Sequence, residues 1–218
     1  MTGRLASISR VLLSLLLPTI SGCGTAGLDV HYPEARVNRT VLASAPSRRV
    51  EIKPVADRRR DTTRIGVKPK NSGDIVTSRP VADLVHEALV LELSKNGHSV
   101  VSNGQDVVLA ATVEDFRLDE VAGYASTRYV GRVVIALNIV DEQTSEILLT
   151  RRYVGIKRRE IDKASEDARR ETMDAALART MHDLATDPEL AKVLASVRTA
   201  GRRSRYAQCL LDGARPSN

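Results

Sequence analysis

The stretch 129–140, YVGRVVIALNIV, decides the fold. Its apolar residues alternate as in a strand with one buried face. That face carries Val133, Ile135, Leu137 and Ile139. The stretch 106–118, DVVLAATVEDFRL, alternates in the same way before it, and the stretch 147–157, ILLTRRYVGIK, follows after a short polar turn. Three consecutive strands with short polar connections predict an antiparallel meander.

The stretches before the meander add short strands and a helix. Residues 49–54 and 64–68 have the alternation of short strands, and a further brief strand is expected at 100–101. A helix is expected to begin at Pro80, because proline suits the first helical position, and to end at Gly97 in a left-handed cap.

The stretch after the meander is predicted to be helical. Asp162 or Ser165 can cap a helix with an apolar stripe, and Asp187 with Pro188 can begin a second, shorter one. Helices on one face of a mostly antiparallel sheet form an α+β fold, here a two-layer sandwich. Apolar residues make up 42% of the chain but aromatic residues only 3%, so the core must consist of Val, Leu, Ile and Ala.

The N-terminus has the pattern of an export signal. A short polar start with Arg4 and Arg10 is followed by an apolar run over 11–20. A helix rises about 1.5 Å per residue, so this run spans only about half of a ~30 Å hydrocarbon core. The run is therefore too short for a transmembrane helix.

The apolar run ends in Ile20-Ser21-Gly22-Cys23. This resembles the lipobox of bacterial lipoproteins, in which the cysteine is diacylated before the signal is cut off. The resemblance implies that lipid such as palmitate on Cys23 holds the chain on a membrane, since two or more acyl chains anchor a protein stably. An ordinary secretory signal with a chance cysteine is the alternative. Gly24 rather than Asp follows the cysteine, which by resemblance to enterobacterial sorting favours the periplasmic face of the outer membrane.

These features divide the chain into a signal peptide at 1–22, a lipidated tether at 23–47, an α+β periplasmic domain at 48–197 and a basic tail at 198–218. The tether is expected because small, polar and proline residues show no sustained period there. The net charge of +6 comes from the signal and from the tail, which is expected to be disordered, so the domain is neutral in sum. Cys209 has no partner in the mature chain and is either inert or bridges two chains.

No motif indicates catalysis, a cofactor or a metal. His86-Glu87 begins like a zinc-protease helix, but Val90 occupies the position of the required second histidine. The other histidines, which have no Cys or His at ligand spacing, are His31, His98 and His182. The sequence therefore predicts a protein that is not an enzyme. An exported chain does not meet nucleic acid, so membranes and the cell wall are the acidic surfaces within its reach.

Two basic clusters are candidate contacts with an anionic surface. They are Arg58, Arg59 and Arg60 in the domain and Arg202, Arg203 and Arg205 in the tail. Arginine binds phosphate in a bidentate manner, and a cation near an anionic membrane contributes about 1 kcal/mol. The alternatives are a solvated strand face and a turn closed by Asp–Arg pairing for the first cluster, and a disordered end that only aids solubility for the second.

The order of elements and three local patterns resemble the YajG-like lipoproteins of Gram-negative bacteria. The patterns are Asp57-x-Arg59-x-Asp61, the helix end at 89–97, and Met181-x-x-Leu184-x-x-Asp187 before a short amphipathic helix. The resemblance covers about 48–197, without the basic tail. It implies a lipid-anchored periplasmic α+β domain with no established activity, and therefore no catalytic residues to transfer.

The sequence leaves two main functions open. In the first, the domain is a binding or assembly factor that docks an envelope protein through the sheet or a helix groove. In the second, it handles an amphiphile such as phospholipid or lipopolysaccharide. A peptidoglycan-synthesis activator is a third possibility, because such lipoproteins share a small α+β domain on a tether. A flat apolar patch over a filled core would favour the first, and an exposed apolar groove the second.

Overall fold

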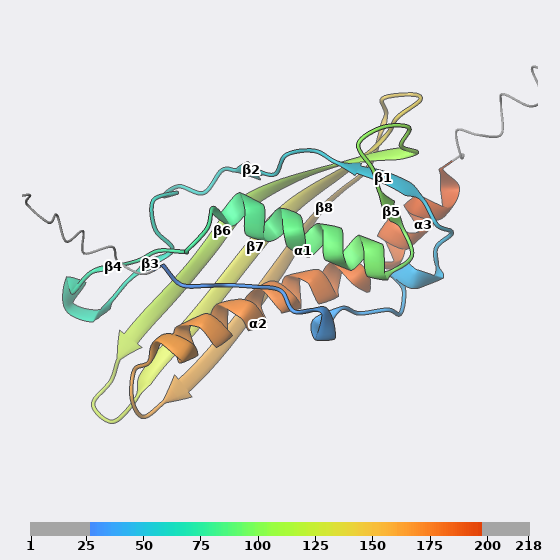
Figure 1. The fold of residues 1–218 in the computed structure, drawn as a ribbon. Helices are drawn as coiled ribbons and strands as arrows, with labels where there is room; N and C mark the ends of the chain where they lie inside the picture. The colour runs from blue at the N-terminus through green and yellow to red at the C-terminus, as the bar shows by residue number, and fades with distance from the viewer. Residues whose placement is uncertain (1–26, 198–218) are drawn as a thin grey trace, which may run out of the picture.

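The computed structural model describes residues 27–197, which form a mixed sheet with helices on one of its faces (Figure 1). The sheet consists of β1 (Arg49–Ile52), β2 (Ala56–Asp57), β5 (Ser99–Val100), β6 (Val107–Ala122), β7 (Thr127–Asp141) and β8 (Ile147–Ile161). The helices are α1 (Val81–Lys95), α2 (Glu166–Ala185) and α3 (Pro188–Ser196). The smaller elements are η1 (Glu34–Arg36), η2 (Leu42–Ser44), η3 (Pro69–Asn71) and the paired strands β3 (Gly66–Val67) and β4 (Asp74–Ile75).

The strand order is β5-β1-β6-β7-β8, and β2 also pairs with β6. Strands β6, β7 and β8 are antiparallel, which confirms the meander and the α+β class. Strand β1 runs parallel to both β5 and β6. The parallel β1–β5 pair arises because α1 lies in the connection between them, and parallel strands need such a crossover.

The core lies between the sheet and the helices, and its residues alternate along the strands as predicted. On β7 the inward residues, none more than 1% exposed, are Val133, Ile135, Leu137 and Ile139. On β6 the register shifts between Val113 and Asp115. This bulge inserts one extra residue, so Phe116 and Leu118 still face the helices although they are out of period with Val113.

Helix α2 covers one of the two faces predicted for β8. Tyr153 on that face is 6% exposed, whereas Ile156 on the other is 43% exposed. Glycines allow the close approach of the helix. A Cβ on Gly155 would lie 2.7 Å from the Thr180 nitrogen and closer still to the Ala176 carbonyl oxygen. Glycine within a strand thus sets the distance between α2 and the sheet.

The helix ends largely follow the predicted caps. Ser165, rather than Asp162, caps α2 through its side chain, and Asp187 caps α3. Gly97 has a φ of +89°, as expected for a left-handed cap after α1. The sequence predicts Pro80 as the first helical residue. It is instead the N-cap residue, with a non-helical backbone, and α1 begins one residue later at Val81.

The prediction of a tether is wrong for residues 27–47, which pack on the domain and are called the N-terminal strap below. Leu28, Val30 and Leu42 are at most 3% exposed and belong to the core. The strap, the first blue segment in Figure 1, runs along α1 and α2. Sequence periodicity misses it because single apolar residues along an irregular chain follow neither a helical nor a strand period.

A buried carboxylate fastens the strap to α1. Glu92 accepts hydrogen bonds from the Tyr32 hydroxyl at 2.5 Å, the Asn38 backbone N–H at 3.2 Å and the Asn96 side chain at 3.1 Å. Burial raises the pKa of the Glu92 carboxyl, and these hydrogen bonds only partly oppose the shift. The Asn38 side-chain nitrogen also lies 3.0 Å from Nδ1 of His182 on α2, so the strap is tied to both helices.

The predicted signal peptide, Cys23, the basic tail with Arg202, Arg203 and Arg205, and Cys209 lie outside the described residues. Within residues 27–197, no helix is both long enough and apolar enough to cross a membrane.

Candidate functional site

Strands β6, β7 and β8 have one face that α1 and α2 do not cover (Figure 1). We call it the open face. In the half of the sheet toward the β6–β7 turn, its residues are Glu114, Asp115, Arg117, Asp119 and Val121 on β6, Arg128, Val130, Arg132 and Val134 on β7, and Arg152, Val154, Ile156, Arg158 and Glu160 on β8. Because strand pairing aligns them in rows, residues far apart in the sequence become neighbours. One row, for example, joins Asp119, Val130 and Arg158.

Ion pairs cross the middle of the open face. Nε of Arg132 lies 3.2 Å from Asp115, and Nε of Arg152 lies 2.5 Å from Glu114. The second pair joins β8 to β6 across β7. Val134 is 0% exposed although it is on this face. Long arginine side chains can cover apolar neighbours with their carbon stems, so this part of the face is already closed by its own side chains.

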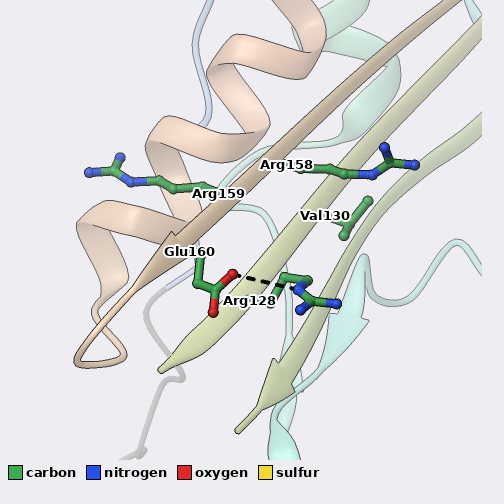
Figure 2. A pocket seen from close by; sticks show the side chains of 5 residues that line it. All are labelled: Arg128, Val130, Arg158, Arg159 and Glu160. Atoms are coloured by element: carbon green, nitrogen blue, oxygen red, sulfur yellow. Dashed lines mark ion pairs between the residues drawn. The ribbon is translucent and has the colours of Figure 1, made fainter. Parts of the chain in front are cut away.

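The open face becomes hollow toward the β6–β7 turn (Figure 2). The hollow has a volume of about 660 Å³ and is lined by Arg128, Val130, Arg158, Arg159 and Glu160. Figure 2 shows Arg128 and Arg158 on either side of Val130, whereas Arg159 points away to the other side, where it pairs with Glu171 of α2. Arg128 is only loosely paired, with its Nε 3.9 Å from Glu160. Arg158 has no ion pair with any residue of 27–197.

A longer groove continues from this hollow toward β3. It has a volume of about 1250 Å³ and shares Arg128 and Val130 with the hollow. Its walls are residues 59–67 and the outer part of β6 from 114 to 121, where Val121 is 58% exposed. Hollow and groove together form one concave region with apolar side chains beside arginines. Such a region can bind a carboxylate or phosphate group next to an apolar group.

The structure divides the predicted cluster of Arg58, Arg59 and Arg60. The Arg59 side chain is 6% exposed and lies 2.8 Å from Asp57, and it also donates to the Thr62 and Arg64 carbonyl oxygens. The prediction that Arg59 contacts an anionic surface is therefore wrong, because its guanidinium holds the turn together. The exposed Arg58 and Arg60 have no ion pair within residues 27–197.

The sequence reasoning did not identify Arg128 and Arg158. They are brought together only by strand register, which places Arg158 opposite Val130 and next to Arg128. The available signal was their position in the alternation, since both fall on the side opposite the core residues of their strands. Within residues 27–197, no group of three or more His, Cys, Asp or Glu side chains could hold a metal ion.

One family model and several solved structures are similar to this chain. A family model described as "Uncharacterized lipoprotein" (Lipoprotein_16) matches residues 37–195. Protein XCC0632 from Xanthomonas campestris is similar with a TM-score of 0.52 at 15% identity, over 77% of this chain and 94% of that one. Lipoprotein GNA1162 from Neisseria meningitidis has a TM-score of 0.36 at 13% identity, over 65% and 100%. The comparison with curated proteins finds no match.

The structural likeness to XCC0632 shows the fold alone, because the sequences are only 15% identical. The family match is more specific, since it covers well over half of the chain and includes both the meander and the predicted Asp57-x-Arg59-x-Asp61 turn. The chain therefore belongs to the YajG-like family of uncharacterised lipoproteins.

Proposed function

We propose that this protein is a lipid-anchored accessory factor of the cell envelope that binds a partner protein through the open face. Lipid on Cys23 holds it on the periplasmic side of the outer membrane, which the Gly24 after the cysteine favours over the inner membrane. The observation that carries the proposal is the concave, arginine-lined end of a sheet face that no helix within residues 27–197 covers.

The chemistry of this region suits a protein partner. Protein interfaces are enriched in arginine and apolar side chains and depleted of lysine and acidic residues at their centre. Here Arg158 has no ion pair with any of the described residues 27–197 and lies beside the half-buried Val130 of β7. Ile156, on β8 like Arg158, is 43% exposed. The partner is expected to present a carboxylate to Arg158 and an apolar side chain to Val130 and Ile156.

In-cell photo-crosslinking tests this proposal with the full-length chain. A photoreactive residue at Ile156 should give a defined adduct with one envelope protein, and Arg158→Glu in the same chain should greatly reduce that adduct. The matched control is Arg179, which is exposed on α2 on the other side of the sheet. Adducts that are equally diverse at both positions, and insensitive to Arg158→Glu, would exclude a specific interface on the open face.

A separate experiment tests the anchor. Cys23→Ala should abolish the incorporation of labelled palmitate and leave an unlipidated, uncleaved or misprocessed form, because the acyl chains on Cys23 are the proposed anchor. A variant that still incorporates palmitate normally would show that Cys23 is not the lipid site.

The second candidate, an amphiphile-handling factor, is favoured by a different region. A hollow of about 570 Å³ lies along α1, and its lining includes the apolar side chains of Leu84, Val90 and Leu91 and Tyr32 of the strap, together with polar residues such as His86 and Glu87. Mass spectrometry of the protein purified without detergent distinguishes the two functions. A stoichiometric lipid that Leu91→Arg removes would favour the amphiphile-handling function.

A further inference from the structure

We propose that one end of the domain rests on the phospholipid surface of the anchoring membrane. This anchor-proximal end consists of the β3–β4 turn (68–73), the β6–β7 turn (123–126) and the β8–α2 turn (162–165). The inference rests on the proposed lipidation of Cys23 and adds to it the orientation of the domain and the surface that meets the lipid.

The first step is the length of chain between the anchor and the strap. Five residue steps separate Cys23 from Leu28, and an extended chain spans at most about 3.6 Å per residue, so the two are no more than ~18 Å apart. Leu28 is fixed, because its N–H donates to the Val76 oxygen at 2.7 Å and its oxygen accepts from the Ser78 N–H at 3.0 Å. The part of the domain around Val76 must therefore lie close to the bilayer.

The second step is which elements share this end. Residue 76 follows directly after β4, and the Leu118 N–H donates to the Ile65 oxygen at 2.7 Å, which joins the β3–β4 pair to the last part of β6. Thr127 pairs with Ile161, so the β6–β7 and β8–α2 turns are also adjacent. Figure 1 shows all three turns toward the left of the molecule, where the strap begins, and α3 and the β7–β8 turn at the opposite end.

The third step is the chemistry of this end. Lys68, Lys70 and Lys163 have no ion pair within residues 27–197, and the unpaired acids beside them are Asp162 and Glu166. Tyr124 in the β6–β7 turn is fully exposed. Lysines are attracted to anionic headgroups, and tyrosine is enriched at membrane–water interfaces. The excess positive charge and the exposed tyrosine complement an anionic phospholipid surface.

The same geometry limits the basic tail. Strand β6 spans 15 residue steps from Ala122 to Val107, or about 50 Å at ~3.3 Å per residue. Beside its Val107 end, the Arg48 side chain donates a hydrogen bond to the Leu194 oxygen of α3, so α3 lies at the end far from the membrane. Arg205 is eight residues beyond Val197 and can reach at most about 29 Å from it. The predicted membrane contact of Arg202, Arg203 and Arg205 is thus out of reach when the anchor-proximal end lies on the bilayer.

Fluorescence quenching on vesicles tests the orientation. The lipidated full-length chain with Cys209→Ser is labelled with bimane at Ser72→Cys, Tyr124→Cys or Glu142→Cys and placed in phosphatidylethanolamine–phosphatidylglycerol vesicles that contain headgroup-region spin-labelled lipid. All three sites are exposed, and Glu142 lies in the β7–β8 turn at the far end as the matched control. Quenching is expected at positions 72 and 124 and only background quenching at 142.

Two outcomes would overturn the inference. One is a palmitate-labelled protein that floats with the vesicles but shows only background quenching at all three positions. The other is stronger quenching at position 142 than at 72 and 124. Failure of the anchor itself is distinguishable, because the protein would then carry no palmitate and would not float. Lys70→Glu with Lys163→Glu should also reduce quenching at position 124, and unchanged quenching would refute the role of the lysines.

Discussion

Replacement of Gly155 by alanine should loosen α2 from the sheet. The added Cβ would lie 2.7 Å from the Thr180 nitrogen and closer to the Ala176 carbonyl oxygen. Non-bonded carbon atoms prefer separations of about 3.5–4.0 Å. Both contacting atoms belong to the helix backbone and cannot rotate away, so the whole helix must shift by about 1 Å or more.

The size of the effect follows from what α2 contributes to the core. Met173, Leu177, Met181 and Leu184 are at most 1% exposed on this helix. Overpacking typically costs about 1–3 kcal/mol, and the backbone clash places Gly155→Ala at the upper end of that range. For a domain of this size, 1 kcal/mol lowers the melting temperature by about 2–4 °C, so a decrease of about 6–12 °C is expected.

Gly131 provides the matched control on the neighbouring strand. A Cβ there would lie 3.0 Å from the Thr172 oxygen and 3.2 Å from the side chains of Met173 and Thr172, which can partly move. Gly131→Ala should therefore cost only about 1 kcal/mol. Thermal and denaturant unfolding of both variants measures the difference. Equal losses, or no loss for Gly155→Ala, would refute the argument that glycine sets the helix–sheet distance.

Three further predictions concern the core and the strap. Leu137→Ala should lower the free energy of unfolding by about 2–5 kcal/mol, because Leu137 is 1% exposed. Thr150→Ala, on the exposed side of β8, should lower it much less. Similar losses for the two variants in denaturant melts would mean that the inner face of the sheet is misassigned. Burial raises the pKa of the Glu92 carboxyl from 4.5, so the folded state holds its proton more tightly than the unfolded state. The free energy of unfolding should therefore fall as pH rises from about 4.5 through the raised pKa. Glu92→Gln should remove this fall, and wild-type and variant curves of stability against pH that run parallel would contradict the prediction. Limited proteolysis should leave residues 27–47 protected, since their apolar side chains are buried, and rapid cleavage there in the native protein would show that the strap is open.

The fold was predictable where burial imposes a regular period. The three long strands, the caps at Ser165 and Asp187 and the glycine after α1 follow from alternation and capping preferences. The strap was not predictable, because Leu28, Val30 and Leu42 are isolated apolar residues whose burial depends on helices elsewhere in the chain. Local periodicity carries no information about such long-range packing.

The candidate site was less predictable than the fold. The basic cluster at 58–60 stands out in the sequence, but Arg59 uses its charge to close the turn with Asp57. Arg128 and Arg158 are 30 positions apart and become neighbours only through the β7–β8 register. A charge cluster in the sequence therefore indicated a structural turn, while the exposed arginines of the site were dispersed among alternating strand residues.

The orientation and the open face together restrict the partner. If the anchor-proximal end lies on the bilayer, the long strands stand away from the membrane and the open face points sideways. The hollow with Arg128 and Arg158 is then near the membrane, because Arg128 is only one residue from the start of β7 at the β6–β7 turn. Ile147, which is 60% exposed, pairs with Val140 and lies about 40 Å further out along the sheet. A partner that lies in or on the same membrane would crosslink from Ile156 but not from Ile147, whereas a partner that spans the periplasm would crosslink from both.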